Sequence, residues 1–326
     1  MRWQFLHLVL SFYTFSLHSF EKVVIWGHKL HSHTHSYVHK GFYDAFVDLG
    51  YDTYWFDSHD DMGDFDCSHT LFLTEGQVDQ NIPLREDCIY LLHNCDHQKY
   101  KSLTCVTLQV YTDDVLKRSD MMQIAPCIYW NIANKELIFP WATDLLPQEI
   151  EQIKHDLAVV QKEKVVYWIG TLGEGYFGNL SELQPFMVAC EERGIPFVTP
   201  NPSATGIEAI EHQRLITSAY LAPAIVGRWQ KQVGYIPCRI FKNISYGQLG
   251  VTNSRQVYEL FERKIVYNPD TYQLFYDAEE RLQTITREEI FELMDLIKEN
   301  HTYLNRIKTI FDFFKQLNIC IENNSK

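Results

Sequence analysis

The stretch "VVYWIGTLGEGYFGNLSEL", residues 165–183, decides the fold class of this 326-residue chain. It opens with apolar residues typical of a buried strand, continues into a glycine-rich loop and ends where a helix begins. Within the loop, Gly173, Gly175 and Gly178 form G-x-G-x-x-G, the spacing of a dinucleotide-binding turn. A loop between a strand and a helix N-terminus presents backbone N–H groups that favour an anion. The stretch therefore predicts an α/β lobe whose loop approaches phosphates.

A dinucleotide-binding lobe needs more than three glycines. It also needs an acid at the end of its second strand, about 20 residues on, to bind ribose hydroxyls. Here that strand is "PFVTPN" (196–201), which ends without Asp or Glu. The loop therefore fits the phosphates of another ligand better, while a plain tight turn and an NAD-dependent oxidoreductase using residues 173–178 stay open as alternatives.

The rest of the chain reads as two α/β halves. In the first half, a helix pattern at 34–49 is surrounded by short β-rich runs, at residues 22–27, 51–57, 69–74, 88–94, 105–111 and 127–133. A proline-containing, charged segment at 139–164 ends this half, and the strand at 165 restarts the pattern. We therefore predict an α/β fold of two Rossmann-like lobes facing a central cleft, residues 21–150 and 151–326.

One long apolar stripe closes the chain. Thr286 and Glu289 form a capping box. Apolar residues then recur at helical spacing, at Ile290, Leu293, Met294, Ile297, Leu304, Ile307, Phe311 and Phe314. This predicts one C-terminal helix that packs back across the lobes.

The N-terminal residues and the net charge bear on location and partners. Residues 1–20 are hydrophobic and resemble a possible signal segment, and residues 5–17 suit weak membrane association. Because the first strand begins at about residue 22, a cytoplasmic or membrane-associated protein is favoured slightly, with export or a lumenal location as the alternative. The net charge of −13 predicts no nucleic-acid partner, since phosphate backbones are bound by basic surfaces.

The most informative stretch is "GYIPCRIFKNISYGQLGVTNSRQVYELFERKIVYNPDTYQLF" (234–275). It resembles the donor-binding region of GT-B glycosyltransferases, in a group-1-like family related to spore-maturation-type transferases. The matching residues are Arg239, Phe241 and Gly247, and the similarity extends over most of residues 139–280. The resemblance implies sugar transfer from a nucleotide sugar to a glycan or other hydroxyl acceptor, with no metal and no other cofactor. It assigns acceptor binding to residues 21–150 and donor binding to 151–326.

The sequence departs from that family at one position, where Lys242 replaces an acid. Arg239 and Lys242 are three residues apart, so they share one helix face. Two cations on one face suit a diphosphate leaving group. The alternative for the face that these two cations share is a solvated basic surface or an ion pair with Glu259.

The resemblance also implies further donor-site residues. Gly170, Thr171 and Gly173 belong to the loop that approaches the diphosphate. Asn253 and Ser254 follow the strand-like "GVT" and are expected to hydrogen-bond donor hydroxyls or phosphate.

A histidine cluster lies in "WGHKLHSHTHSYVHKG" (26–41), between the first strand and the first helix. Three interpretations compete: a metal site, a polar loop, and an acceptor site facing the cleft. The resemblance to GT-B transferases implies that, in an inverting transfer, a histidine near the start of the first helix deprotonates the acceptor hydroxyl. His35 lies closest to that place and His33 is next. A retaining transfer needs no such base, and these histidines would then orient the substrate. A protein that only binds metal, through His28, His31, His33, His35 and His39, is a further alternative.

The sequence also contains a D-x-D motif, Asp64-Phe65-Asp66, of the kind that binds a metal in the rival GT-A fold. It lies in the acidic run "DDMGDFD" and does not end an apolar strand. We therefore predict that it is a solvated loop, and no residue of the donor site is assigned to a metal.

Overall fold

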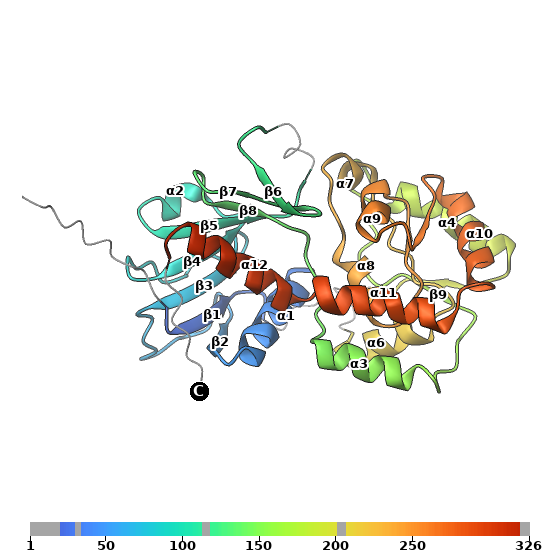
Figure 1. The fold of residues 1–326 in the computed structure, drawn as a ribbon, viewed down its shortest axis with the longest axis horizontal. Helices are drawn as coiled ribbons and strands as arrows, with labels where there is room; N and C mark the ends of the chain where they lie inside the picture. Colours follow the sequence, from blue (N-terminus) through green and yellow to red (C-terminus); the bar gives the residue numbers. More distant parts are fainter. Residues whose placement is uncertain (1–19, 30–33, 113–117, 201–206, 320–326) are drawn as a thin grey trace, which may run out of the picture.

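The computed structural model describes residues 20–29, 34–112, 118–200 and 207–319, which form two α/β lobes side by side (Figure 1). The predicted two-lobed α/β class is confirmed. Within the described residues, no helix is long and apolar enough to cross a membrane. The proposed membrane contact at residues 5–17 lies outside the described residues.

The first lobe is built on one eight-stranded sheet. Its order is β2-β1-β3-β4-β5-β8-β7-β6, parallel from β2 to β8 and antiparallel between β8, β7 and β6. In chain order the strands are β1 Lys22–Trp26, β2 Asp52–Phe56, β3 Thr70–Glu75, β4 Ile89–His93, β5 Thr104–Gln109, β6 Met122–Ala125, β7 Ile128–Asn131 and β8 Glu136–Ile138. The apolar run at 127–133 thus forms the middle of an antiparallel extension, whose outer strands are short.

Helix α1, Thr34–Asp48, brings the first lobe to the junction. One face is fully buried, with Val38, Phe42, Ala45 and Phe46 packed in the core of that lobe. Because α1 follows β1 in a parallel sheet, its N-terminus lies at the carboxyl edge of the strands, where ligands bind in such folds. The short α2, His97–Tyr100, follows β4.

The second lobe has short strands around a central extended segment. The strands are β9 Val166–Tyr167, β10 Phe197–Val198, β11 Val251–Thr252 and β12 Val266–Tyr267. Residues 220–226 join the two pairs, because the N–H of Tyr167 donates to the carbonyl of Leu221 (3.1 Å) and the N–H of Ala224 to that of Val251 (2.8 Å). The helices are α3 Pro147–Asp156, α4 Leu180–Glu192, α6 Ala209–Ser218, α7 Arg228–Gln232, α8 Cys238–Ser245, α9 Arg255–Leu260 and α10 Thr271–Leu282.

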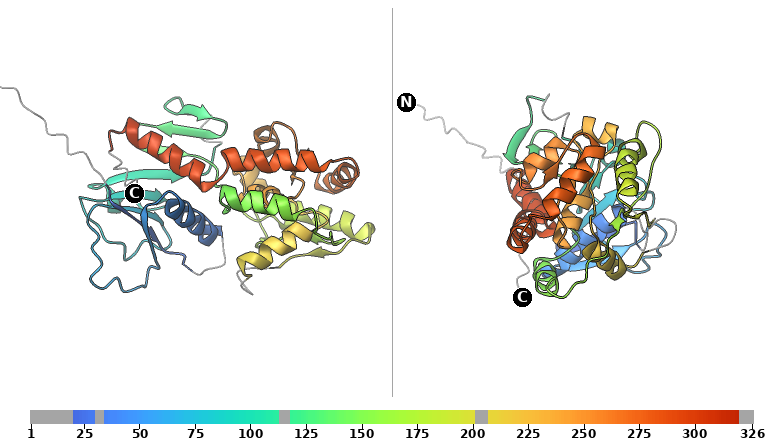
Figure 2. Two further views of the ribbon diagram at one scale, coloured as in Figure 1. Left: turned by 60° about the horizontal axis from the view of Figure 1, so that its bottom comes forward. Right: turned by 90° about the vertical axis from the view of Figure 1, so that its right-hand side faces the viewer.

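The C-terminal segment returns to the first lobe, as predicted, but not as one helix. It forms α11, Arg287–Asn300, against α3 and α8, and then α12, Tyr303–Gln316, against α1. Figure 2 shows the two helices end to end, each over a different lobe. The apolar periodicity continues across the break, yet Thr302 starts a new helix by accepting a hydrogen bond from the N–H of Asn305.

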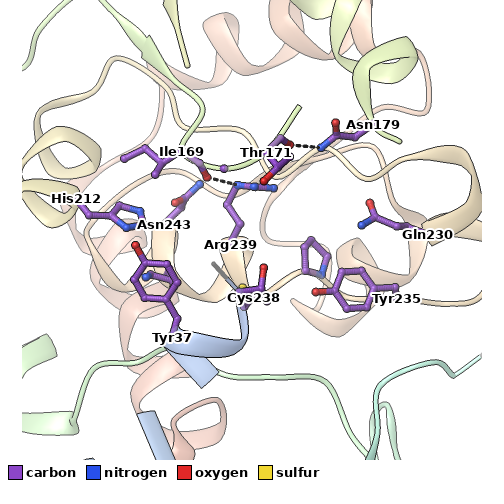
Figure 3. Close-up of a pocket in the computed structure, with 14 residues that line it drawn as sticks. Tyr37, Ile169, Thr171, Asn179, His212, Gln230, Tyr235, Cys238, Arg239 and Asn243 are labelled. Atoms are coloured by element: carbon purple, nitrogen blue, oxygen red, sulfur yellow. Dashed lines mark hydrogen bonds between the residues drawn. The ribbon is translucent and has the colours of Figure 1, made fainter. Parts of the chain in front are cut away.

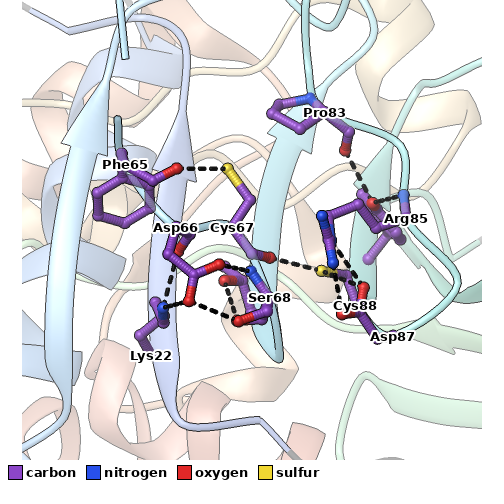
Figure 4. A network of polar contacts seen from close by, with 11 residues as sticks. Lys22, Phe65, Asp66, Cys67, Ser68, Pro83, Arg85, Asp87 and Cys88 are labelled. Atoms are coloured by element: carbon purple, nitrogen blue, oxygen red, sulfur yellow. Dashed lines mark hydrogen bonds and ion pairs between the residues drawn. The ribbon is translucent and has the colours of Figure 1, made fainter. Parts of the chain in front are cut away.

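The D-x-D motif lies away from the junction of the lobes. Lys22, the first residue of β1, donates to the carbonyl of Asp66 (2.7 Å), which places the motif at the amino edge of the sheet (Figure 4). The side chain of Asp66 is 70% exposed and accepts from the hydroxyl of Ser68. This position agrees with a solvated loop.

Candidate functional site

A pocket lies between the lobes. It holds about 880 Å³, including space open to solvent. The first lobe contributes the start of α1, and the second contributes the glycine loop, α6 and α8 (Figure 3). Its lining residues are Thr34, Tyr37, Ile169, Gly170, Thr171, Asn179, His212, Gln230, Tyr235, Pro237, Cys238, Arg239, Lys242 and Asn243.

Arg239, in the first turn of α8, is the main cation of this pocket. Its Nε donates to the carbonyl of Ile169 (3.1 Å), and its guanidinium lies 3.8 Å over the ring of Trp168. Burial lowers the pKa of Arg239, although a guanidinium stays protonated in proteins. Within the described residues, no carboxylate pairs with it. A held, charged guanidinium without a counter-ion is suited to bind an anion.

The glycine loop fits closely against this arginine. At Gly170, φ is +148°, and a Cβ would lie 2.1 Å from Nη2 of Arg239. The N–H of Gly173 donates to Oδ1 of Asn179 (3.0 Å), whose Nδ2 donates to the carbonyl of Thr171 (3.2 Å). A Cβ on Gly178 would meet the carbonyl oxygen of Gly173 at 2.1 Å. The loop residues thus lie beside the pocket, and two of the glycines are required by close contacts.

Lys242 also lines the pocket, but its charge is already balanced. Its Nζ pairs with Asp144 (3.1 Å) and lies 3.6 Å over the ring of Tyr37. The alternative of a solvated face or a pair with Glu259 is wrong for Lys242. Its side chain is buried, and Glu259 pairs instead with Arg255 and Arg263. The sequence could not indicate Asp144, which is 98 residues away.

Asn253 and Ser254 make internal contacts. Oδ1 of Asn253 accepts from the N–H of Val226 (2.8 Å), and its Nδ2 donates to the carbonyl of Val226 (3.0 Å) and to Glu182 (3.2 Å). Ser254 caps α9 through the N–H of Val257. Neither lines the interlobe pocket. Their assignment to donor binding stays a prediction, and these contacts give both a structural role.

Two buried polar atoms at the pocket were not predicted. Nδ1 of His212 and Oδ1 of Asn243 have no hydrogen-bond partner within the described part of the chain. Burial lowers the pKa of His212 well below its ordinary value, and Lys242 and Arg239 lower it further, so its ring is neutral. Unpaired buried polar atoms are costly unless a ligand or water satisfies them. Each is a polar residue within a helix, and nothing in the neighbouring sequence indicates that its side chain faces a pocket.

On the first-lobe side, histidine rings gather at the carboxyl edge of the sheet. Nε2 of His28 donates to a carboxylate oxygen of Glu75 (3.0 Å), and Nδ1 of His35 lies 3.9 Å from the same oxygen. The rings of His39 and His93 flank them, with centroids 5.2 Å from His28 and 5.6 Å from His35. His33, the second predicted base, lies outside the described residues. The structure adds Glu75, which sequence reasoning missed because it lies 47 residues from His28.

The charge states around Glu75 follow from burial. Burial alone raises the pKa of this carboxyl, but hydrogen bonds from His28 and from the N–H of Gln77 outweigh it and leave the pKa below its ordinary value. Burial lowers the pKa of His39 to about 3 and lowers that of His93. His28, His35 and Glu75 form a group that could hold a metal ion.

The architecture corresponds to a known class of fold. No protein-family model matches the sequence, and no curated protein matches it. Solved structures do match over nearly their whole length, and they are GT-B glycosyltransferases. The chain therefore has the two-lobed GT-B fold.

Three of these structures illustrate the likeness. AviGT4, a glycosyltransferase involved in avilamycin A biosynthesis, has a TM-score of 0.55 at 10% identity, covering 91% of this chain and 98% of its own. An alpha-glucosyltransferase in complex with UDP has a TM-score of 0.54 at 8% identity, and the match covers 90% of this chain and 99% of the other. The alpha,alpha-trehalose 6-phosphate synthase from Burkholderia multivorans has a TM-score of 0.53 at 11% identity, and the match covers 92% of this chain and 97% of the other. At these identities the likeness shows the fold alone.

Proposed function

We propose that this protein is a glycosyltransferase that transfers a sugar from a nucleotide-sugar donor to a hydroxyl group of a glycan or similar acceptor. The observation that carries the proposal is Arg239, a charged guanidinium in a pocket between the two lobes, with no carboxylate partner among the residues that the structure describes. Breaking a sugar–diphosphate bond leaves negative charge on the diphosphate, which cations and oriented N–H groups stabilise.

In this proposal the donor diphosphate binds against Arg239 and the glycine loop. The guanidinium supplies a fork of donors, and the loop leads to the N-terminus of α4, whose dipole favours an anion. Lys242 faces the same pocket, but Asp144 balances its charge. Arg239 therefore supplies most of the positive charge that would face the diphosphate. In this proposal no metal is needed at the diphosphate. UDP is the first donor nucleotide to test, because an alpha-glucosyltransferase of the same fold is described with UDP.

His212 and Asn243 are proposed to complete the donor contacts. A neutral His212 offers Nδ1 and Asn243 offers Oδ1 to a polar ligand in the pocket. Hydroxyls of a sugar or ribose would satisfy both atoms, which removes the cost of burying them unpaired.

The acceptor is proposed to approach from the first lobe, where His35 remains the candidate base. Its side chain is partly exposed, while Thr34 and Tyr37 on either side of it line the pocket. A solved complex of the alpha-glucosyltransferase contains DNA. For this chain, with its net charge of −13, we still expect no nucleic-acid acceptor.

A thermal-shift series tests the donor. We expect UDP to raise the melting temperature, and to do so equally in EDTA and in Mg²⁺ if no metal holds the diphosphate. GDP, ADP, CMP and NAD serve as competitors. Stabilisation by NAD and not by any nucleoside diphosphate would instead support the oxidoreductase alternative.

Substituting Arg239 tests the site itself. Arg239→Ala removes charge-assisted hydrogen bonds of about 1.5–3 kcal/mol, which corresponds to UDP binding weakened by roughly 10–150-fold in calorimetry. Arg214→Ala is the matched control, because that arginine is on the surface and pairs with Glu211 and Glu163. Unchanged UDP affinity in a folded Arg239→Ala protein would refute the proposal.

A further inference from the structure

Three side chains of metal-ligating type meet at the carboxyl edge of the first-lobe sheet. Glu75 is the last residue of β3, His28 follows β1 by two residues, and His35 is in the first turn of α1. Because β1 and β3 are neighbouring parallel strands, their carboxyl ends lie together. Three residues from separate segments therefore converge on one point.

The spacing of their ligand atoms suits a single ion. Nε2 of His28 and Nδ1 of His35 lie 3.0 and 3.9 Å from the same oxygen of Glu75, and all three ligand atoms lie within 4.8 Å of one another. In a tetrahedral zinc site with bonds of about 2.1 Å, ligand atoms are about 3.4 Å apart. Small rotations of the side chains would bring these three atoms to that spacing.

The charge balance calls for a cation. Glu75 is 2% exposed, and within the described chain no lysine or arginine pairs with it. Its carboxylate accepts from the N–H of Gln77 (2.9 Å). A buried carboxylate needs an opposite charge nearby. Either a protonated imidazole or a divalent ion can supply that charge, and only the ion uses all three convergent groups at once.

The backbone conformation of His28 orients its imidazole towards Glu75. Its φ is +57°, in the left-handed region that non-glycine residues rarely adopt and that costs of order 1–3 kcal/mol. The preceding carbonyl, of Gly27, accepts from Nδ1 of His39 (2.8 Å) and Nε1 of Trp55 (3.0 Å). These bonds hold the strained backbone that turns the His28 imidazole towards Glu75.

We infer that His28, His35 and Glu75 bind one divalent transition-metal ion, with Zn²⁺ as the best match. Two imidazoles and a carboxylate are typical zinc ligands, whereas Mg²⁺ and Ca²⁺ prefer oxygen alone. The site is separate from the donor phosphates and does not depend on the proposed function. A zinc-bound His35 cannot also be the base suggested for it above, so a confirmed metal site would withdraw that role and leave the proposed donor site unchanged.

Metal analysis of the full-length protein tests the inference. The protein is stripped with EDTA, loaded with Zn²⁺, desalted and measured by mass spectrometry, with affinity determined by competition with a chromophoric chelator. We expect about one Zn²⁺ per chain, and at least a 100-fold weaker affinity in Glu75→Gln and in His35→Ala. His155→Ala, at a histidine 85% exposed in α3, should bind as the wild type does. Co²⁺ in place of Zn²⁺ should give visible absorption bands that both variants lose.

Two results would overturn the inference. One is a folded wild-type protein that keeps no Zn²⁺ after desalting; the other is zinc that remains in both variants, which would place it on other groups. His35 is partly exposed at a helix start, so His35→Ala should fold even if Glu75→Gln does not, and circular dichroism checks this. UDP stabilisation measured on the same samples separates failure of the metal site from failure of the proposed transferase.

Discussion

Gly170 illustrates how a single residue shapes the pocket that we propose as the donor site. Its φ of +148° disfavours any side chain, and the space beside it holds the guanidinium of Arg239. The absence of a Cβ lets the arginine reach the backbone and bond the carbonyl of Ile169. The glycine thereby positions the cation that we assign to the diphosphate.

A Gly170→Ala substitution should therefore weaken donor binding more than it destabilises the fold. The new Cβ would displace the guanidinium, and we expect at least about a 10-fold loss of UDP affinity by calorimetry, or 1.4 kcal/mol. Gly50→Ala is the matched control: its φ is +81°, but nothing lies within 4 Å of its added Cβ. Both variants should lose about 1 kcal/mol of stability. Equal UDP affinity in the two would contradict the role of Gly170.

His39 should make the protein sensitive to acid. Its folded pKa of about 3, set by burial, lies below the 6.5 of an unfolded histidine. Between these values the unfolded chain binds a proton that the folded chain does not. The contribution of His39 is thus fully present above pH 6.5 and decreases as the pH falls towards 3, by about 1.4 kcal/mol per pH unit.

Urea unfolding in EDTA at a series of pH values measures this effect. His39→Asn keeps an N–H donor for the carbonyl of Gly27 but cannot titrate, so its stability should fall less steeply between pH 6 and 4.5. His155→Asn removes an exposed histidine and should keep the wild-type slope. A wild-type slope in His39→Asn would show that His39 is already protonated in the folded state.

At the scale of elements, α12 is part of the core of the first lobe although it ends the described chain. Ile307, Ile310, Phe313 and Phe314 are buried in the same cluster as strands of the first-lobe sheet. Phe313 also stacks on Trp130 of β7, at a centroid distance of 5.5 Å. The helix therefore stabilises a lobe that begins almost 300 residues earlier in the chain.

Removing one ring of α12 should destabilise that lobe. Phe313→Ala should cost about 3–5 kcal/mol of unfolding free energy, because the ring is fully buried. Phe311→Ala, on the same helix with a partly exposed ring, should cost clearly less. Urea denaturation followed by circular dichroism gives both values. Equal costs would mean that α12 is not held by its buried face.

Most helices and strands could be predicted from the sequence, and the break that was missed has a physical cause. The strands at 22–27 and 88–94 and the helix at 34–49 lie within one or two residues of their predicted places. Hydrophobic periodicity depends only on residues close together in the chain, so the sequence alone is enough to predict these elements. The break at Thr302 was missed because the apolar spacing continues through it, and only the cap shows that a new helix begins.

At the scale of the whole molecule, polar contacts hold the crossing between the lobes. The guanidinium of Arg306, buried in α12, donates to the carbonyls of Pro140 (2.7 Å) and Trp141 (3.2 Å). Nearby, Thr143 and Ser245 share a hydrogen bond of 2.8 Å, and Asp144 pairs with Lys242. These bonds tie the first chain crossing to α8 and to the returning helix.

Breaking the buried pair should have a large effect. Asp144→Asn leaves the Lys242 ammonium buried without a counter-charge, which should cost about 3–5 kcal/mol in urea unfolding. Adding Lys242→Met should recover most of the loss, since the methionine carries no charge. The matched control is Asp312→Asn, in an exposed pair with Lys315, which should change stability by less than about 1 kcal/mol. A similar small loss at Asp144 would contradict a structural role for the pair.

The sequence by itself determined the α/β class, the two lobes and the strand–glycine loop–helix unit, because each follows from a short continuous pattern of residues. It also pointed to Arg239, whose assignment to the diphosphate stays a prediction. Only the tertiary structure decided that Asp144 neutralises Lys242, that Glu75 meets the histidines, and that His212 and Asn243 leave polar atoms at the pocket with no partner in the described part of the chain. These facts join segments up to 98 residues apart. The reason is physical: charge balance and hydrogen bonding depend on which side chains the packed lobes bring within a few ångströms, and no local pattern records that distance.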